Sequence, residues 1–184
     1  MAPVILALKQ TDWAEVKILA TAQHRHLLDQ VLKLFDVEPD IDLNIMRSNQ
    51  ALTTLTARLL LDLDGVFLAE KPDAILVQGD TTTVMTAALA GFYHKIPVGH
   101  VEAGLRTGNM MNPFPEEMNR VVASKFAHWH FAPTESSRQN LLAESVPDSS
   151  IFVTGNTVID ALLHVSERDV PMEIKLDSSK RLIL

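Results

Sequence analysis

The sequence contains no cysteine, no long apolar run and no recognisable export signal, and each absence narrows the possible functions. Without cysteine there is no disulfide, no zinc–thiolate centre and no thiol nucleophile. No apolar stretch approaches the roughly 20 residues that a membrane-spanning helix needs. The first residues lack the basic segment, apolar run and cleavage site of a secretory signal. Together these absences favour a cytoplasmic location and no membrane partner.

Clustered positive charge is also lacking. The chain has 16 Lys and Arg against 23 Asp and Glu, which gives a formal net charge of −7. Because nucleic-acid binding relies on clustered basic residues, we expect no general nucleic-acid partner. The 47% apolar and 21% charged composition is that of a globular protein with a substantial core. A length of 184 residues has room for one α/β domain and the beginning of another.

Short apolar runs alternate with amphipathic stretches along the chain, which predicts an α/β fold: a parallel sheet with helices on both faces. Strands are expected at 16–20, 41–46, 74–78, 97–101, 128–132 and 151–154. Helices are expected at 26–35, 51–70, 116–127, 134–144 and 158–165, with a further helix that Thr81 to Thr83 cap and that runs to about residue 94. Residues 1–8 suit a strand and a helix equally. Residues 167–180 read as a linker, and residues 181–184 as the start of a strand.

Three acidic residues fall near the carboxyl ends of the predicted strands, where parallel sheets bind ligands. Asp80 follows strand 74–78, Glu102 follows strand 97–101, and Glu116 opens a helix behind a Pro-rich loop. A group of carboxylates at this edge would suit acid–base chemistry on a carbohydrate.

Each acid also has a structural interpretation. Asp80 could be a helix N-cap, a position that favours Asp. Either Glu116 or Glu117 could complement the helix dipole behind Pro115. Glu102 is harder to explain in this way, because it follows an apolar strand and is flanked by Ala and Gly. A carboxylate in such a place needs a partner or a function.

The histidines and the remaining motifs give weaker signals. His128 and His130 alternate on a predicted strand, and His100 lies two residues before Glu102, so a metal site is conceivable. No third ligand is evident, and we favour core histidines and no metal. The glycine-rich dinucleotide motif, the Walker loop and the nucleophile elbow are all absent. The segment 155–157 could be a tight turn with a helix cap that faces a ligand.

Six segments nevertheless resemble one family over nearly the whole chain and in the family's order. They read QHRHLLDQVLKLF, QGDTTT, PVGHVEAGLRTG, NPFPEEMNR, APTESSRQNLL and FVTGNTVIDALL, and they are similar to the non-hydrolysing UDP-N-acetylglucosamine 2-epimerases. The resemblance implies a Rossmann-like domain that is one half of a GT-B-like, two-domain fold. It also implies an isomerase that interconverts UDP-N-acetylglucosamine and UDP-N-acetylmannosamine without a cofactor, and that forms homodimers.

The resemblance also assigns roles to the acids. Asp80, Glu102 and Glu116 match the family's catalytic acids. We expect Glu102 and Glu116 to transfer protons, and Asp80 to support developing charge or to share a proton. Arg120 matches a position that lines the site, where it could orient Glu116 or the ligand.

Two further residues are substrate-binding candidates by the same comparison. Gln23 and Arg25 belong to the family's QHR loop, which approaches the ligand or a regulatory site in this interpretation.

The chain departs from the family pattern at both ends. The family's first strand, with its Gly-Thr-Arg-Pro-Glu turn, and most of its second domain have no counterpart here. We therefore expect residues 1–166 to form the N-terminal domain without its first strand, and residues 167–184 to form a linker and the first strand of a second domain. The isolated chain should turn over at no appreciable rate. Two alternatives stay open: a hydrolysing relative, and a non-catalytic half that pairs with a separate partner.

Overall fold

The computed structural model describes residues 1–21, 25–45 and 50–168, with backbone only for residues 25–29. Gln23 and residues 169–184 lie outside this described part, together with the strand expected at 181–184 and most of the expected linker.

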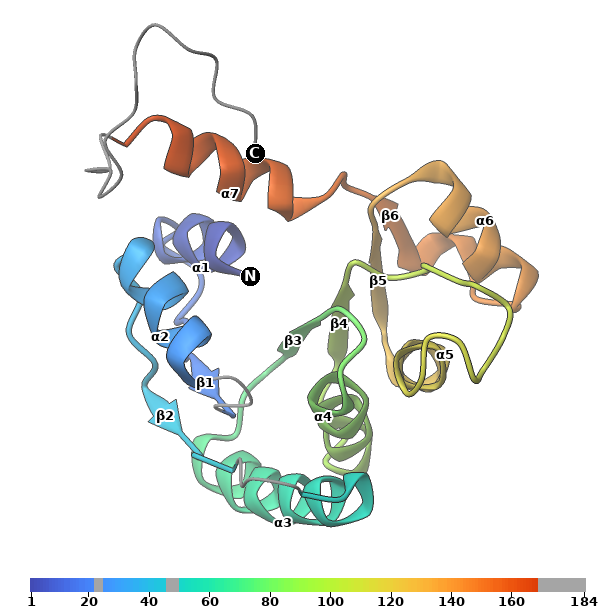
Figure 1. The fold of residues 1–184 in the computed structure, drawn as a ribbon, viewed down its shortest axis with the longest axis horizontal. Coiled ribbons are helices and arrows are strands. Elements are labelled where there is room, and N and C mark those ends of the chain that lie inside the picture. The colour runs from blue at the N-terminus through green and yellow to red at the C-terminus, as the bar shows by residue number, and fades with distance from the viewer. Residues whose placement is uncertain (22–24, 46–49, 169–184) are drawn as a thin grey trace, which may run out of the picture.

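In the described residues, six strands form two parallel sheets, as the alternating pattern predicts (Figure 1). The larger sheet has the order β3-β4-β5-β6, and the smaller one pairs β1 with β2. The strands are β1 (Leu19–Ala20), β2 (Ile41–Asp42), β3 (Ile75–Gln78), β4 (Val98–Val101), β5 (Trp129–Ala132) and β6 (Ile151–Val153). Parallel pairing places the carboxyl ends of β3 to β6 at one edge, which is the edge that carries the predicted acids.

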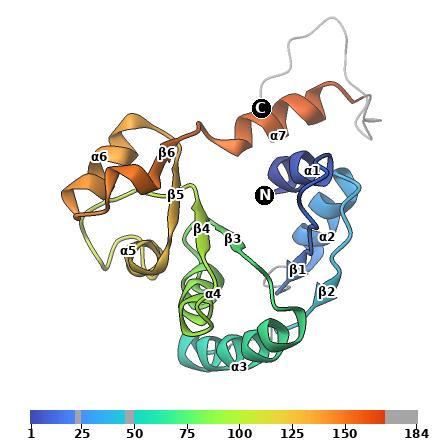
Figure 2. The same cartoon turned by 180° about the vertical axis from the view of Figure 1, so that it is seen from behind.

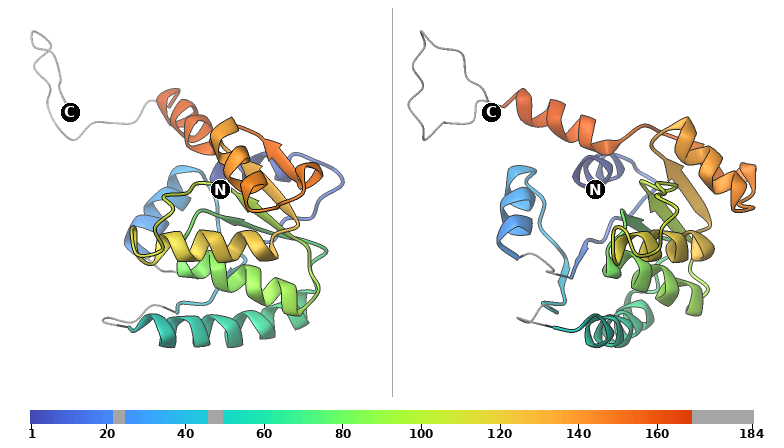
Figure 3. Two further views of the ribbon diagram at one scale, coloured as in Figure 1. Left: turned by 90° about the vertical axis from the view of Figure 1, so that its right-hand side faces the viewer. Right: turned by 45° about the vertical axis from the view of Figure 1, so that its right-hand side comes forward.

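Helices lie on both sides of these sheets. They are α1 (Ala2–Lys9), α2 (Arg25–Leu34), α3 (Leu52–Glu70), α4 (Thr82–Tyr93), α5 (Glu116–Phe126), α6 (Glu135–Ala143) and α7 (Thr157–Ser166), with a short 3₁₀ turn at Asp148–Ser150. Helices α3, α4 and α5 pack side by side in that order (Figure 3). On the other side, α1, α2 and α7 gather around the buried residues Ile18, Phe35 and Val37 (Figure 2).

Side chains from the sequence-predicted positions cap three of the helices that begin at the carboxyl edge. The Thr81 hydroxyl accepts the main-chain N–H of Val84 at 3.3 Å, and Thr134 caps α6 in the same way. The Asn156 side-chain oxygen accepts the N–H of Val158 at 3.0 Å and caps α7. Such caps satisfy N–H groups that the first helical turn leaves free, and they fix where each helix starts. All three caps confirm sequence-based expectations.

The first two strands are shorter than the sequence predicts. Strand β1 covers two residues of the expected 16–20, and β2 covers two of the expected 41–46. A side chain replaces a main-chain hydrogen bond that a longer β1 would form, because the Asp40 carboxylate accepts the N–H of Ile18 at 2.7 Å. The segment that suited a strand and a helix equally is helix α1. Within the described residues, no helix combines the length and the apolar character needed to cross a membrane.

Candidate active site

The three predicted acids come together at the carboxyl edge of the larger sheet. Asp80 lies between β3 and α4, Glu102 directly follows β4, and Glu116 is the first residue of α5. All three side chains are partly exposed. Glu116 and Glu102 are both close enough to Asp80 to act electrostatically on its carboxyl. The loop after β3, the loop after β4 and the first residue of α5 therefore bring three carboxylates to one place.

Glu102 has an unusual backbone conformation that fixes its position. Its φ of +67° lies in the left-handed region, which non-glycine residues seldom adopt. Its neighbours are both held in the sheet: the Val101 carbonyl accepts the N–H of Gly79 at 3.1 Å, and the N–H of Ala103 donates to Phe131 at 3.0 Å. Backbone strain of this kind persists only where surrounding contacts enforce it, and it is frequent at functional sites.

Asp80 lies beside both negative and positive groups. Burial raises the pKa of the Asp80 carboxyl, the Arg120 guanidinium opposes this, and the charges of Glu116 and Glu102 raise the pKa further. The net pKa is raised. Arg120 Nη1 lies 3.3 Å from Asp80 Oδ2, and the Asn119 side-chain amide donates to the Asp80 main-chain oxygen at 2.9 Å. An acid with a raised pKa and a charged partner is well suited to exchanging protons.

Glu117 holds Arg120 in place from the interior. The Glu117 side chain is almost fully buried, with 1% of the residue exposed. It accepts Arg120 Nε at 2.7 Å and forms a second contact with Arg120 Nη2. It also accepts the main-chain N–H groups of Thr107 and Gly108 at 3.0 and 2.9 Å. Burial by itself would raise the pKa of Glu117, but Arg120 and the two N–H groups lower it overall.

Several sequence interpretations can now be corrected. Asp80 is not the N-cap of α4, because Thr81 fills that position. Of the two adjacent glutamates, Glu117 has the structural role, since it is buried and fully bonded while Glu116 stays partly exposed. Arg120 pairs with Glu117 and Asp80, and its expected role in orienting Glu116 or the ligand stays a prediction.

The two QHR candidates are not placed at the site. Arg25 is the first residue of α2, and its side chain is outside the described part of the structure. Gln23 is outside it as well. Both assignments therefore stay predictions.

Sequence reasoning did not single out Asn156 and Asn119 as site residues. The Asn156 amide nitrogen lies 3.3 Å from Glu102 Oε1, and Asn119 holds the main chain at Asp80. The turn at 155–157 suggested a helix cap that faces a ligand, but nothing in its sequence indicates that it meets a residue 54 positions earlier in the chain.

The histidines do not form a metal site in the described part of the chain. His100 and His130 are buried, as expected for core histidines, and the His100 ring bonds to the Gly79 carbonyl oxygen at 2.7 Å. Burial, together with the nearby His100 and Arg106, lowers the pKa of His130 to about 4, so this ring is neutral at pH 7. His128 was expected in the same strand and core, but β5 begins at Trp129 and His128 is exposed.

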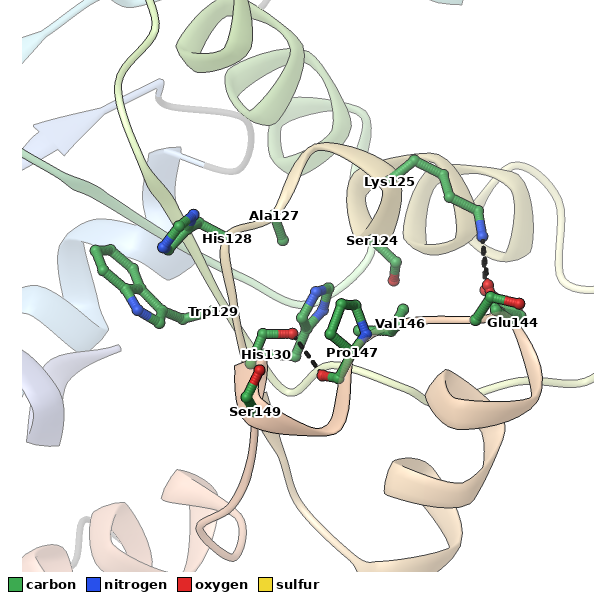
Figure 4. A pocket seen from close by; sticks show the side chains of 12 residues that line it. Ser124, Lys125, Ala127, His128, Trp129, His130, Glu144, Val146, Pro147 and Ser149 are labelled. Carbon is green, nitrogen blue, oxygen red and sulfur yellow. Dashed lines mark hydrogen bonds and ion pairs between the residues drawn. The ribbon is translucent and has the colours of Figure 1, made fainter.

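A pocket of about 480 Å³ lies at the opposite, amino edge of the larger sheet (Figure 4). The end of α5, the start of β5 and the turn after α6 line it, and its polar residues include His130, Lys125 and Glu144. A hydrogen bond joins Lys125 to the main chain of Glu144. None of the three clustered acids lines this pocket. The pocket is therefore separate from the carboxyl edge at which ligands of parallel sheets usually bind.

The fold and the site together define a Rossmann-like α/β protein with a candidate acid–base centre at the carboxyl edge of its sheet. A family model described as UDP-N-acetylglucosamine 2-epimerase matches residues 6–184. The chain belongs to the UDP-N-acetylglucosamine 2-epimerase family.

Individual relatives agree with this assignment. A UDP-N-acetylglucosamine 2-epimerase of Yersinia pestis is 56% identical over 194 residues, a match that covers 100% of this chain and 52% of the relative. The enzyme of that name from Escherichia coli (strain K12) is 57% identical over 168 residues and covers 91% of this chain and 45% of the relative. A crystal structure of UDP-GlcNAc 2-epimerase from Neisseria meningitidis bound to UDP-GlcNAc has a TM-score of 0.87 and 55% identity, covering 89% of this chain and 44% of that one. The chain thus spans about half the length of the curated relatives it matches.

Proposed function

We propose that this chain contributes the acid–base centre of an isomerase that interconverts UDP-N-acetylglucosamine and UDP-N-acetylmannosamine. The observation that carries the proposal is the gathering of Asp80, Glu102 and Glu116 at one sheet edge. Membership of the family supports the substrate class, because a relative of 55% identity has a structure bound to UDP-GlcNAc. We also propose that the domain carrying this centre ends at residue 166, where α7 ends.

The reaction needs more than one proton-transfer group. The bond from C1 to the diphosphate oxygen breaks, and its electron pair leaves with UDP. A carboxylate removes the proton from C2, and the C2–H electron pair forms the C1=C2 bond of a 2-acetamidoglucal. In the return step a proton reaches the opposite face of C2, and the diphosphate oxygen bonds to C1 again. Two faces of C2 require two groups or a relay between them, and no oxidant or reductant is consumed.

The geometry supports a division of roles among the acids. We assign proton transfer at C2 to Glu102 and Glu116, which lie at the two ends of the loop between β4 and α5. Asp80 is assigned the support of oxocarbenium character at C1, as carboxylates do in glycosidases, or the sharing of a proton with the other two acids. Arg120, paired with Asp80 at 3.3 Å, keeps that acid within reach of the other two. The positive groups that hold the diphosphate are assigned to the part of the whole protein that this chain does not span.

Deuterium exchange at C2 tests this proposal directly. UDP-N-acetylglucosamine is incubated in deuterated water with the chain alone and with a chimera. The chimera joins this chain to the parts of the E. coli relative that lie outside the matched stretch. NMR should show deuterium at C2 for the chimera and very little for the chain alone, since catalytic acids and binding groups act as a unit.

Controls separate the alternatives. The Glu102→Gln chimera should fold to the same melting temperature and lose exchange at least 100-fold, as expected for loss of a proton-transfer group. Release of free N-acetylmannosamine in place of its UDP derivative would indicate the hydrolysing reaction. A folded chimera that leaves C2 protonated, with or without Glu102, would contradict the proposed function and favour a non-catalytic half.

We further propose a cytoplasmic homodimer that uses the outer surface of α3 and α4. The His94–Asp64 contact of 2.8 Å brings the end of α4 to the middle of α3. Large apolar side chains of these two helices are more than half exposed, namely Leu61, Leu68, Phe92 and Tyr93. Exposed apolar side chains of this size are the groups that an interaction surface would bury. Sedimentation velocity should give a dimer for the chain and a monomer for Leu61→Glu, and a monomeric parent chain would refute this surface.

A further inference from the structure

Asn156 makes two side-chain hydrogen bonds that use both ends of its amide. Its oxygen accepts the N–H of Val158 at 3.0 Å and caps α7. Its nitrogen lies 3.3 Å from Glu102 Oε1, 54 positions earlier in the chain. The orientation of the amide is unambiguous, because a main-chain N–H needs an acceptor and a carboxylate needs a donor. Glu102 is therefore bonded to the first turn of α7 through a group that cannot rotate without losing the cap.

The turn that carries Asn156 is itself attached to the sheet. Gln78, the last residue of β3, lies with its amide nitrogen 3.4 Å from the Thr157 hydroxyl. The other end of the Gln78 amide accepts a hydrogen bond from the Met1 ammonium group. The start of α7 is thus tied both to the end of β3 and to Glu102 behind β4. Asn156 belongs to an anchored turn, which is what a positioning residue requires.

The two oxygens of Glu102 have different surroundings. Oε1 is the atom that faces the Asn156 amide. Oε2 lies on the side of Gly79, where a Cβ built on that residue would come within 3.7 Å of it. Gly79 has a φ of +86° and directly precedes Asp80, so Oε2 faces the loop that carries the other acid. The amide therefore occupies one oxygen and leaves the other facing the loop that carries Asp80.

We propose that Asn156 is a positioning residue for Glu102: it holds Oε1 and leaves Oε2 as the oxygen that exchanges a proton with C2 of the sugar. This inference rests on the proposed function and extends it. In the elimination step the C2 proton moves to Oε2 while its electron pair forms the C1=C2 bond. The Asn156 amide donates only, so it stays on Oε1 and transfers no proton itself. The start of α7 adds the partial positive charge of a helix N-terminus next to the carboxylate.

Two substitutions of Asn156 distinguish its proposed role in positioning Glu102 from its role as the N-cap of α7. Ser and Asp are both good N-caps, so Asn156→Ser and Asn156→Asp should keep α7 and the melting temperature close to those of the parent. Ser removes the amide donor, and Asp replaces it with a like charge. In the chimera we expect kcat for C2 exchange to fall about 10- to 100-fold, more for Asp than for Ser, with KM changed less than about twofold.

The cap of the neighbouring helix provides a matched control. Thr134 caps α6 at the same sheet edge through its hydroxyl. Thr134→Ala should lower stability as a lost cap does and leave kcat unchanged. If Asn156→Ser retains the kcat of the parent, or loses activity only in proportion to lost stability, the positioning role is wrong.

A measurement that needs no catalytic turnover distinguishes failure of the positioning role of Asn156 from failure of the proposed function. NMR of the chain itself follows the Asn156 side-chain amide between about pH 3 and pH 8. Its signals should shift with pH in the parent and lose that shift in Glu102→Gln. Identical behaviour in both proteins would overturn the inference. An inactive chimera with a normal Asn156 titration would instead contradict the proposed function while leaving the Asn156–Glu102 bond established.

Discussion

Arg120 contacts both the interior of the domain and the candidate site. Its guanidinium is buried between Glu117, which is inside the domain, and Asp80, which is partly exposed at the sheet edge. Separating a buried charge from its partner is costly, because the remaining charge is left in a poor solvent. Glu117 therefore stabilises the fold by neutralising Arg120, and it also determines where Arg120 meets Asp80.

Replacing Glu117 with Gln should be strongly destabilising. The free energy of unfolding at pH 7 should fall by about 3 kcal/mol, the usual cost of removing one partner of a buried ion pair. The pKa of Glu117 is lowered in the folded state, so its contribution is complete above the unfolded pKa of about 4.3 and is lost as pH falls through the folded value. Urea denaturation should show the parent and the variant converging at acidic pH.

The adjacent glutamate is the matched control for this prediction. Glu116→Gln changes the same charge one position away on a partly exposed side chain. It should alter the free energy of unfolding by less than about 0.5 kcal/mol. Equal destabilisation by both substitutions would mean that net charge, and not the buried pair, determines the effect.

These residues also show how far sequence reasoning reaches at this scale. The positions of the three acids follow from the alternation of strands and helices, since a residue after a parallel strand must lie at the carboxyl edge. That Glu117 is buried and paired while Glu116 stays partly exposed cannot be predicted in this way. It depends on where α5 points relative to Thr107 and Gly108, which lie about ten positions earlier in the chain. Contacts between distant loops leave no periodic signal in a single sequence.

At the scale of elements, the loop between β4 and α5 depends on one close approach. Gly104 has a φ of +87°, and a Cβ at this position would lie 2.3 Å from the main-chain oxygen of Ser137 in α6. That oxygen belongs to the backbone of α6, so moving it would cost free energy. The loop that carries Glu102 and leads to Glu116 is therefore packed directly on α6.

Gly104→Ala should accordingly destabilise the protein by about 3 kcal/mol, from the sum of backbone strain and overpacking. Thermal unfolding followed by circular dichroism measures this effect. Gly108→Ala is the comparison, because Gly108 shares a positive φ but has open space around it. If the two variants unfold at the same temperature, strain alone accounts for the effect and the contact with α6 contributes nothing.

The helix starts were more predictable than the strand lengths. Thr81, Thr134 and Asn156 are typical capping residues placed before amphipathic segments, and a cap is a local interaction that the sequence expresses directly. Strands β1 and β2 came out shorter than their apolar runs, because strand length depends on a partner elsewhere in the chain. Asp40 takes one of the N–H groups that a longer ladder would have used.

At the scale of the whole molecule, the layer arrangement follows from the sequence pattern. Alternating strands and amphipathic helices predicted a parallel sheet with helices on both sides, and the structure confirms it. What the pattern did not predict is the absence of pairing between β1 and β3 in the described residues. Leu19 of β1 and Ile75 of β3 still pack against one apolar cluster, so the two sheets share a core without sharing a ladder.

The contact between Asn156 and Glu102 has a consequence for engineering this protein. One amide supports the start of a helix and also occupies one oxygen of an acid at the candidate site. A library screened only for thermal tolerance would accept Ser or Asp at this position, because both preserve the cap. Such variants would pass the screen with the orientation of Glu102 already lost. Selection at position 156 therefore has to score turnover and heat resistance together.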